Sequence, residues 1–253
     1  MVQPELVLIV LAALAPAVVA GAVLAAAARP DGRTWIGALV AFAWGAVIAT
    51  SVASLLNDAA AARLPALAGE PGARVLLPAL LAPTIEELAK AAGFLVVGLV
   101  ARGALGSVRS AIAIGALIGF GFAVAENVGY YLLAAVQGGY DGLGRAVYLR
   151  GVVQSANHAV FTATVGVAVG AARPGRSRTG MLALGLAAAV TLHAIWNASV
   201  SRAISTVLCN APVSGGACAP APDAGDLLLV VPGLEAAFLI PILAVLAWLA
   251  RRR

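Results

Sequence analysis

Seven long apolar runs restrict what this chain can fold into. A helix needs about 20 residues to cross the hydrocarbon core of a bilayer, and a spanning segment must satisfy its backbone hydrogen bonds without water. The runs cover roughly residues 4–28, 34–56, 75–101, 107–136, 147–172, 179–202 and 226–250. We therefore expect an all-α fold, a polytopic transmembrane bundle of about seven helices.

The composition predicts one integral membrane domain over residues 1–253, in the cell membrane and multi-pass. Charged residues make up 11% of the chain, against about 25% in a typical soluble domain. The net charge of +5 does not indicate a nucleic-acid partner, because the basic residues are scattered without aromatic neighbours. The first run lacks a basic segment before it and is too long for a cleavable signal peptide.

The arginines predict the orientation of the bundle. With seven helices, ten arginines fall on one side and five on the other. The positive-inside rule places the richer side in the cytoplasm, so we expect the N-terminus outside and Arg251 to Arg253 inside. The five arginines expected outside are Arg63, Arg74, Arg145, Arg150 and Arg202.

The outer loop expected at 203–225 holds Cys209 and Cys218, the only cysteines. An oxidising exterior permits a disulfide between them, and two free thiols are the alternative. Eight residues separate them and no histidine is near, so they do not form a zinc motif.

Small residues are spaced for close helix packing in the fourth and fifth runs. Gly115 and Gly119 are four apart in one run, and Gly166 and Gly170 are four apart in the next. Glycines at this spacing let helices approach closely in lipid, so we interpret them as packing residues.

Three ionisable residues lie in the middle of the third run. Glu86, Glu87 and Lys90, the only lysine, occur in LLPALLAPTIEELAKAAGFLVVGLV. Each such group costs at least a few kcal/mol at mid-membrane, and by default marks a functional site. Ion pairs at these spacings can neutralise charge within a helix, but one lysine cannot neutralise two carboxylates. Pro83 is expected to break the helix, with Thr84-x-x-Glu87 as a capping box for its restart.

Other titratable groups lie at a similar depth in three further runs. They are Glu126 and the only two histidines, His158 and His193. Glu87, Glu126, His158 and His193 lie about 14 to 18 Å from the outer ends of their runs, at about 1.5 Å per residue. A lone core histidine is ordinarily just a hydrogen-bonded side chain, but two at the level of surplus carboxylates indicate a site.

Three asparagines accompany these residues. Asn197 is one turn after His193 and on the same face, where it either joins the site or links helices. Asn127 and Asn157 flank candidate ligands, and we expect them at most to support those ligands. Glu235, in the last run, is either protonated or paired with an arginine from another helix.

These residue types suit metal-assisted hydrolysis. Carboxylate oxygens and imidazole nitrogens bind Zn²⁺, and a catalytic site keeps three protein ligands and an open position. Glu126, His158 and His193 are the predicted ligands, and Glu86 or Glu87 the predicted general base.

A metal-independent variant uses the same residues. A glutamate and a histidine then activate water directly, and His193 with Asn197 lines the oxyanion site. In either variant, Asn197 or Lys90 can stabilise the oxyanion of a tetrahedral intermediate.

The order of these motifs resembles the PrsW family of intramembrane proteases. The motifs are PTIEELAK at 83–90, FAVAEN at 122–127, the isolated His158 and HAIWN at 193–197. The pattern is also similar to the wider superfamily of CAAX prenyl endopeptidases and bacterial ABI proteins. Glu126 stands where the CAAX enzymes tend to have histidine, which favours the PrsW branch.

The resemblance covers about residues 75–202, the predicted catalytic core. It implies cleavage of a single-pass membrane protein near the outer face, with an anti-sigma factor cut at site 1 as the best-known substrate type. Two other functions stay open. One is a non-catalytic membrane scaffold or chaperone of the same fold, and the other is a proton- or cation-coupled transporter, although no inverted repeat is evident.

Overall fold

The computed structural model describes residues 7–15, 32–172, 177–200 and 226–251, and these are helical with short connections and no strand. Several α-helices continue into π-helical turns, which are labelled η, as is one 3-10 turn, η3. The elements are α2 (Gly32–Ala43), η1 (Trp44–Ala49), α3 (Thr50–Leu76), η2 (Leu77–Leu81), α4 (Ala82–Val100), η3 (Arg102–Leu105), α5 (Val108–Ala146), η4 (Val147–Val153), α6 (Asn157–Ala171), α7 (Arg178–Ile195), η5 (Trp196–Val200), η6 (Asp226–Val230) and α9 (Val231–Arg251).

Four stretches of the described chain are long and apolar enough to cross a membrane: Trp35–Val100, Val108–Ala171, Thr179–Val200 and Leu228–Arg251. The hydropathy pattern predicts seven, so that count is not reproduced. The first two stretches each contain two of the expected runs, because the chain stays helical through the segments between them. Most of the first expected run lies outside the described residues.

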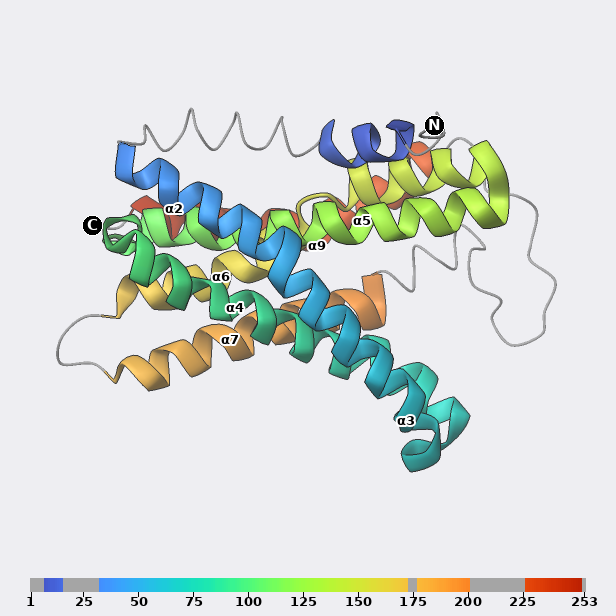
Figure 1. Ribbon diagram of the computed structural model, residues 1–253, viewed down its shortest axis with the longest axis horizontal. Helices are drawn as coiled ribbons and strands as arrows, with labels where there is room; N and C mark the ends of the chain where they lie inside the picture. Colours follow the sequence, from blue (N-terminus) through green and yellow to red (C-terminus); the bar gives the residue numbers. More distant parts are fainter. Residues whose placement is uncertain (1–6, 16–31, 173–176, 201–225, 252–253) are drawn as a thin grey trace.

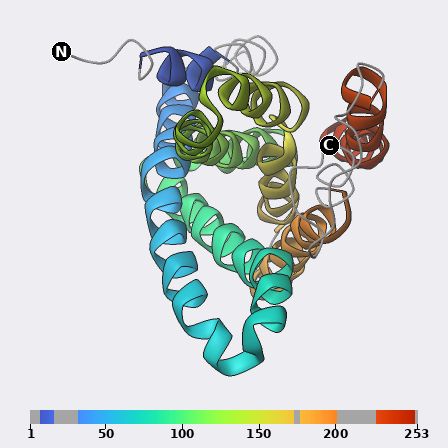
Figure 2. The same ribbon diagram turned by 90° about the vertical axis from the view of Figure 1, so that its right-hand side faces the viewer.

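Both long stretches reverse direction at a glycine. Gly69 has φ +70° and Gly139 has φ +59°, a region that residues with a Cβ rarely adopt. Figure 2 shows α3 and α4 as the two arms of a hairpin that turns beyond Gly69. Beyond Gly139 the chain folds back, so that Leu143 packs against Tyr131. Each reversal replaces a conventional loop, which explains why apolar runs counted separately belong to one continuous stretch.

Helix α5 lies at the centre of the bundle, with its most extensive interface against α6 (Figure 1). The largest buried apolar cluster joins five helices. Its members include Ala41, Val97, Ile118, Val165 and Ala189, from α2, α4, α5, α6 and α7 in turn. These helices therefore hold one another at fixed distances around the polar groups that they carry.

The glycines at four-residue spacing are packing residues, as expected. A Cβ at Gly119 would overlap the carbonyl oxygen of His158, and one at Gly166 would overlap the carbonyl oxygen of Ala111. The backbones of α5 and α6 are thus in direct contact. The first of these contacts fixes the height of His158 along α5.

Pro83 does not break the helix, and the capping box expected there is absent. The wide turn η2 precedes α4 and the chain remains helical through Leu81, which accommodates a proline without an N–H donor. Thr84 donates its hydroxyl to the carbonyl of Leu80 at 2.8 Å. The Glu87 side chain is thereby left for other partners.

The loop 203–225, with Cys209 and Cys218, lies outside the described residues. The disulfide stays a prediction from the sequence.

The contact between Gly119 and His158 can be tested by stability. We expect Gly119→Ala to lower the free energy of unfolding by about 1–3 kcal/mol, because a methyl group has no room there. Gly129→Ala on the same helix is the matched control, since a Cβ there meets nothing within 4 Å, and alanine favours a helix. Equilibrium unfolding in detergent measures both. Equal stability of the two variants would contradict this packing.

Candidate active site

A cavity of about 500 Å³ opens between the helices that carry the predicted site residues. Its walls come from α3, η2, α4, α5, η4, α6, α7 and η5 and from the connection between η4 and α6. Six of its lining residues matter for the chemistry: Glu86, Glu126, Arg150, His158, His193 and Asn197. Residues far apart in the sequence therefore face one space.

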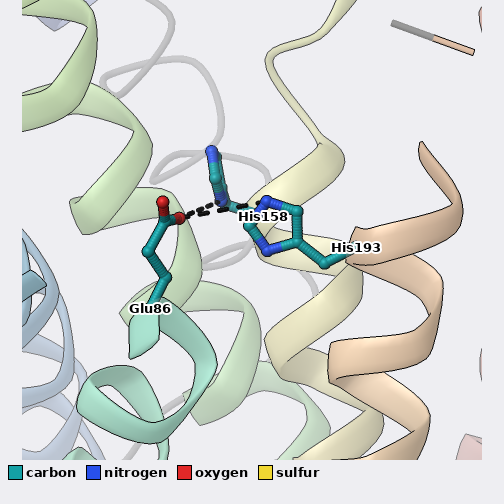
Figure 3. A group of neighbouring side chains, drawn as sticks. All are labelled: Glu86, His158 and His193. Carbon is teal, nitrogen blue, oxygen red and sulfur yellow. Dashed lines mark ion pairs between the residues drawn. The ribbon is translucent and has the colours of Figure 1, made fainter. Parts of the chain in front are cut away.

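Glu86, His158 and His193 form a compact group beside this cavity (Figure 3). Each offers one ligand atom, and these atoms lie within 4.8 Å of one another. Oε2 of Glu86 is 3.9 Å from Nδ1 of His158 and 3.9 Å from Nε2 of His193. All three residues are buried, with exposed fractions of 3–9%. The structure thus brings one of the two adjacent glutamates together with both histidines.

The second ring nitrogen of each histidine faces another carboxylate. Nδ1 of His193 is 3.1 Å from Oε1 of Glu87, and Nε2 of His158 is 3.1 Å from Oε2 of Glu126. Histidines that bind metals almost always donate their other N–H to a carboxylate, a carbonyl or water, which fixes the ring and its tautomer. Glu87 and Glu126 are placed to orient the two imidazoles in this way.

Lys90 contacts two of the carboxylates and does not line the cavity. Its ammonium lies 2.8 Å from Glu87, 3.3 Å from Glu86 and 2.8 Å from Nδ1 of His158, and the side chain is fully buried. Thr162 adds a hydroxyl hydrogen bond to Glu87 at 2.9 Å. Glu87 has no exposed surface and does not line the cavity, whereas Glu86 does.

The group departs from the predicted ligand set at one position. Glu126, not Glu86, is the carboxylate ligand predicted from the sequence. In the structure Glu126 forms an ion pair with Arg150, which also donates from Nε to Asn127 at 2.9 Å. Asn127 thus contacts Arg150 rather than a histidine.

The remaining predicted residues lie at the edge of the group. Asn197 lines the cavity and donates to the carbonyl of Pro78 at 2.8 Å. This hydrogen bond links η5 to η2, which is one of the two roles that the sequence left open for Asn197. Asn157 is buried and also lines the cavity. Glu235 accepts a hydrogen bond from the indole of Trp196 at 3.0 Å, so its described partner is an indole and not an arginine.

Sequence reasoning missed Arg150 and Thr162 as parts of the site. It used Arg150 only to assign topology, although an arginine inside an apolar run, eight residues before His158, was a usable signal. Thr162 is one turn after His158 and therefore on the same helix face. An ordinary threonine in a membrane helix gives no stronger signal.

The charges and donors of the site fit a divalent cation. Three carboxylates, from Glu86, Glu87 and Glu126, face two cations, Lys90 and Arg150. One carboxylate is therefore in excess, and Glu86 is the one that shares its cation with Glu87 and points at both histidines. One oxygen and two imidazole nitrogens are also a donor set that Zn²⁺ accepts.

A helical membrane bundle with a buried carboxylate–imidazole group beside a cavity suits an intramembrane hydrolase. Residues 33–217 match the sequence profile described as PrsW family intramembrane metalloprotease. This match covers more than half of the 253 residues, so the chain belongs to the PrsW family and is an intramembrane protease. Comparison with curated proteins gave no match, and neither did comparison with solved structures.

The buried cation can be tested by its removal. We expect Lys90→Met to lower the free energy of unfolding by about 3–5 kcal/mol, because it leaves two buried carboxylates without their partner. Unfolding in detergent measures this. Arg74→Met is the control, because its pair with Glu70 spans 4.0 Å at the exposed surface and should contribute nothing measurable. A Lys90→Met protein as stable as the control would assign Lys90 no part in holding the site.

Proposed function

We propose that this protease hydrolyses a peptide bond of a membrane protein with a divalent metal, best fitted by Zn²⁺, held by Glu86, His158 and His193. The observation that carries the proposal is the pair of carboxylates behind the two histidines. Each ring is oriented by its own carboxylate, and the other nitrogen of each ring faces Glu86. A metal bound there would polarise the peptide carbonyl and acidify water.

The remaining residues divide the work around this group. Glu126 lines the cavity and keeps part of its side chain exposed, so it can accept the proton of the attacking water and return it to the leaving amine. Glu87 cannot reach that water because it is fully buried, and it instead orients His193. Lys90 pairs with Glu86 and Glu87 and neutralises one of their two charges. Asn197 ties η5 to η2 through its hydrogen bond to the carbonyl of Pro78 and so helps to fix the cavity wall near His193.

A metal-independent mechanism is the second candidate, and one contact favours it. Lys90 lies 2.8 Å from Nδ1 of His158, the nitrogen that faces Glu86. That nitrogen has one lone pair, so the Lys90 hydrogen bond and a metal bond are alternatives. Without a metal, Glu86 is the cavity-lining carboxylate beside both histidines and would itself take the proton from water.

The substrate that we propose is a single-pass membrane protein, cut near the outer face of the cell membrane. The predicted depth of the site, nearer the outer ends of the runs, supports this position. The likeness to the PrsW family supports an anti-sigma factor cut at site 1 as the substrate type. We further propose that the chain is multi-pass, with its N-terminus outside and its C-terminus in the cytoplasm.

Two other functions make different predictions for the same residues. A scaffold or chaperone of this fold would bind membrane proteins without cutting them. A proton- or cation-coupled transporter would move solute and lose that flux when Glu86 is changed. The family assignment supports the protease over both.

Two substitutions distinguish the role of a metal ligand from the role of the general base. We expect Glu86→Gln to lose bound metal and all cleavage, whereas Glu126→Gln should keep the metal and cut at least about 100-fold more slowly, the usual effect of removing a general base. Purified proteins are assayed for metal content and for cleavage of a panel of single-pass membrane proteins. Glu70→Gln, on the exposed surface, is the control.

Three outcomes would contradict this assignment. Full cleavage by a metal-free wild-type protein would favour direct water activation by Glu86. Full cleavage by Glu86→Gln would assign that residue to structure. No cleavage of any panel member, with solute flux that depends on Glu86, would favour the transporter.

The orientation has its own test. We expect a reporter fused in the 203–225 loop to lie outside and one fused after Arg253 to lie in the cytoplasm, because of the arginine bias of ten to five. A cytoplasmic signal from the 203–225 fusion would reverse the proposed orientation.

A further inference from the structure

A peptide that enters the cavity needs hydrogen-bond donors, and three of the neutral polar residues that line it already use theirs. A peptide that enters gives up the water on its carbonyl oxygens, and each carbonyl left unpaired costs about 1–3 kcal/mol. Asn197 already donates to Pro78, the amide of Asn127 donates to a backbone carbonyl, and the indole of Trp196 donates to Glu235. Lys90 is fully buried and does not line the cavity.

Among the described residues that line the cavity, Arg150 is the one lysine or arginine. A guanidinium group has five N–H donors. Nε donates to Asn127 and Nη2 donates to Glu126. Within the described residues Nη1 has no hydrogen-bond partner, and the Arg150 side chain is 21% exposed. Donors are therefore left over on a cation that borders the cavity.

Three residues in one turn of α5 contact the guanidinium group. Glu126 and Asn127 bind its edge, and its central carbon lies 3.7 Å from the centre of the Tyr130 ring. Charge neutralisation of Glu126 needs only one of these contacts. The full set fixes the plane of the guanidinium, so little side-chain entropy is lost when a further acceptor binds.

We propose that Arg150 binds the substrate directly and donates a hydrogen bond to a backbone carbonyl beside the scissile bond. This inference rests on the proposed function and adds a residue that touches the peptide. Glu126 lies between Arg150 and His158 and contacts both, so the guanidinium borders the reacting group without belonging to it. An extended peptide advances about 3.3 Å per residue, so a neighbouring carbonyl lies within one or two residues of the bond that is cut.

The test measures peptide binding by proteins that carry Glu126→Gln, so that Arg150 has no charge of Glu126 to neutralise. The probes are synthetic transmembrane peptides from the cleavage panel, and their dissociation constants are measured in detergent for Glu126→Gln and for Glu126→Gln with Arg150→Met. If Arg150 binds the peptide, the second protein binds about 10- to 100-fold more weakly, the range for a hydrogen bond to a charged group. If Arg150 only neutralises Glu126, the two proteins bind equally, and the proposal is overturned.

Two further variants separate substrate binding from folding. Arg150→Lys keeps the charge beside Glu126 but loses the planar fork, so we expect wild-type metal content with a KM raised about tenfold and a smaller change in kcat. An unchanged KM in this variant would also overturn the proposal. Arg145→Met is the matched control, because Arg145 is exposed, lies in the same segment and does not line the cavity.

The result is distinguishable from a failure of the proposed function. Peptide binding that depends on Arg150, without any cleavage by the wild-type protein, would keep the binding residue and reject the hydrolase mechanism. Cleavage without a contribution of Arg150 would do the reverse.

Discussion

The polar interior of this bundle depends on the buried ammonium of Lys90. It contacts carboxylates one turn earlier on its own helix and an imidazole on α6, and its charge lies 3.8 Å from the centre of the Phe122 ring. A buried charge is tolerated only when it is paired and hydrogen-bonded. The lysine therefore permits two adjacent carboxylates inside an apolar helix. Because the charge of Glu87 is matched there, this residue can hold His193 without being exposed to the cavity.

Backbone contact gives this group its geometry. A glycine on α5 lets the carbonyl of His158 lie directly against that helix, so the first turn of α6 is set by packing and not by the polar contacts alone. His158 then lies between Glu126 on α5 and the carboxylates on α4. In lipid the apolar side chains supply little drive for helix association. Small residues and polar links together explain why these helices meet at the level of the site.

Much of the residue content of the site could be predicted from the sequence, but the contacts between individual side chains could not. An ionisable group in an apolar run is costly wherever it lies, so Glu86, Glu126 and both histidines stood out without a structure. Which oxygen faces which nitrogen depends on helix rotation, and the rotation comes from contacts such as Gly119 against His158. The count of seven helices is not reproduced because hydropathy separates apolar runs at the more polar segments between them, whereas the backbone stays helical there and reverses at one glycine with positive φ.

The reversal at Gly139 explains how Arg150, which the sequence places at the outer side of the bundle, comes to border the site. Beyond Gly139 the chain folds back along α5, so η4 returns to the level of Glu126 and places Arg150 opposite it. The guanidinium thus reaches the cavity from the end of the bundle that the arginine bias predicts to be outside. A cation there neutralises Glu126 and leaves the excess negative charge on Glu86, beside both histidines. The fold-back of α5 thus leaves the excess negative charge where the two histidine nitrogens converge. A divalent metal bound there would compensate that charge.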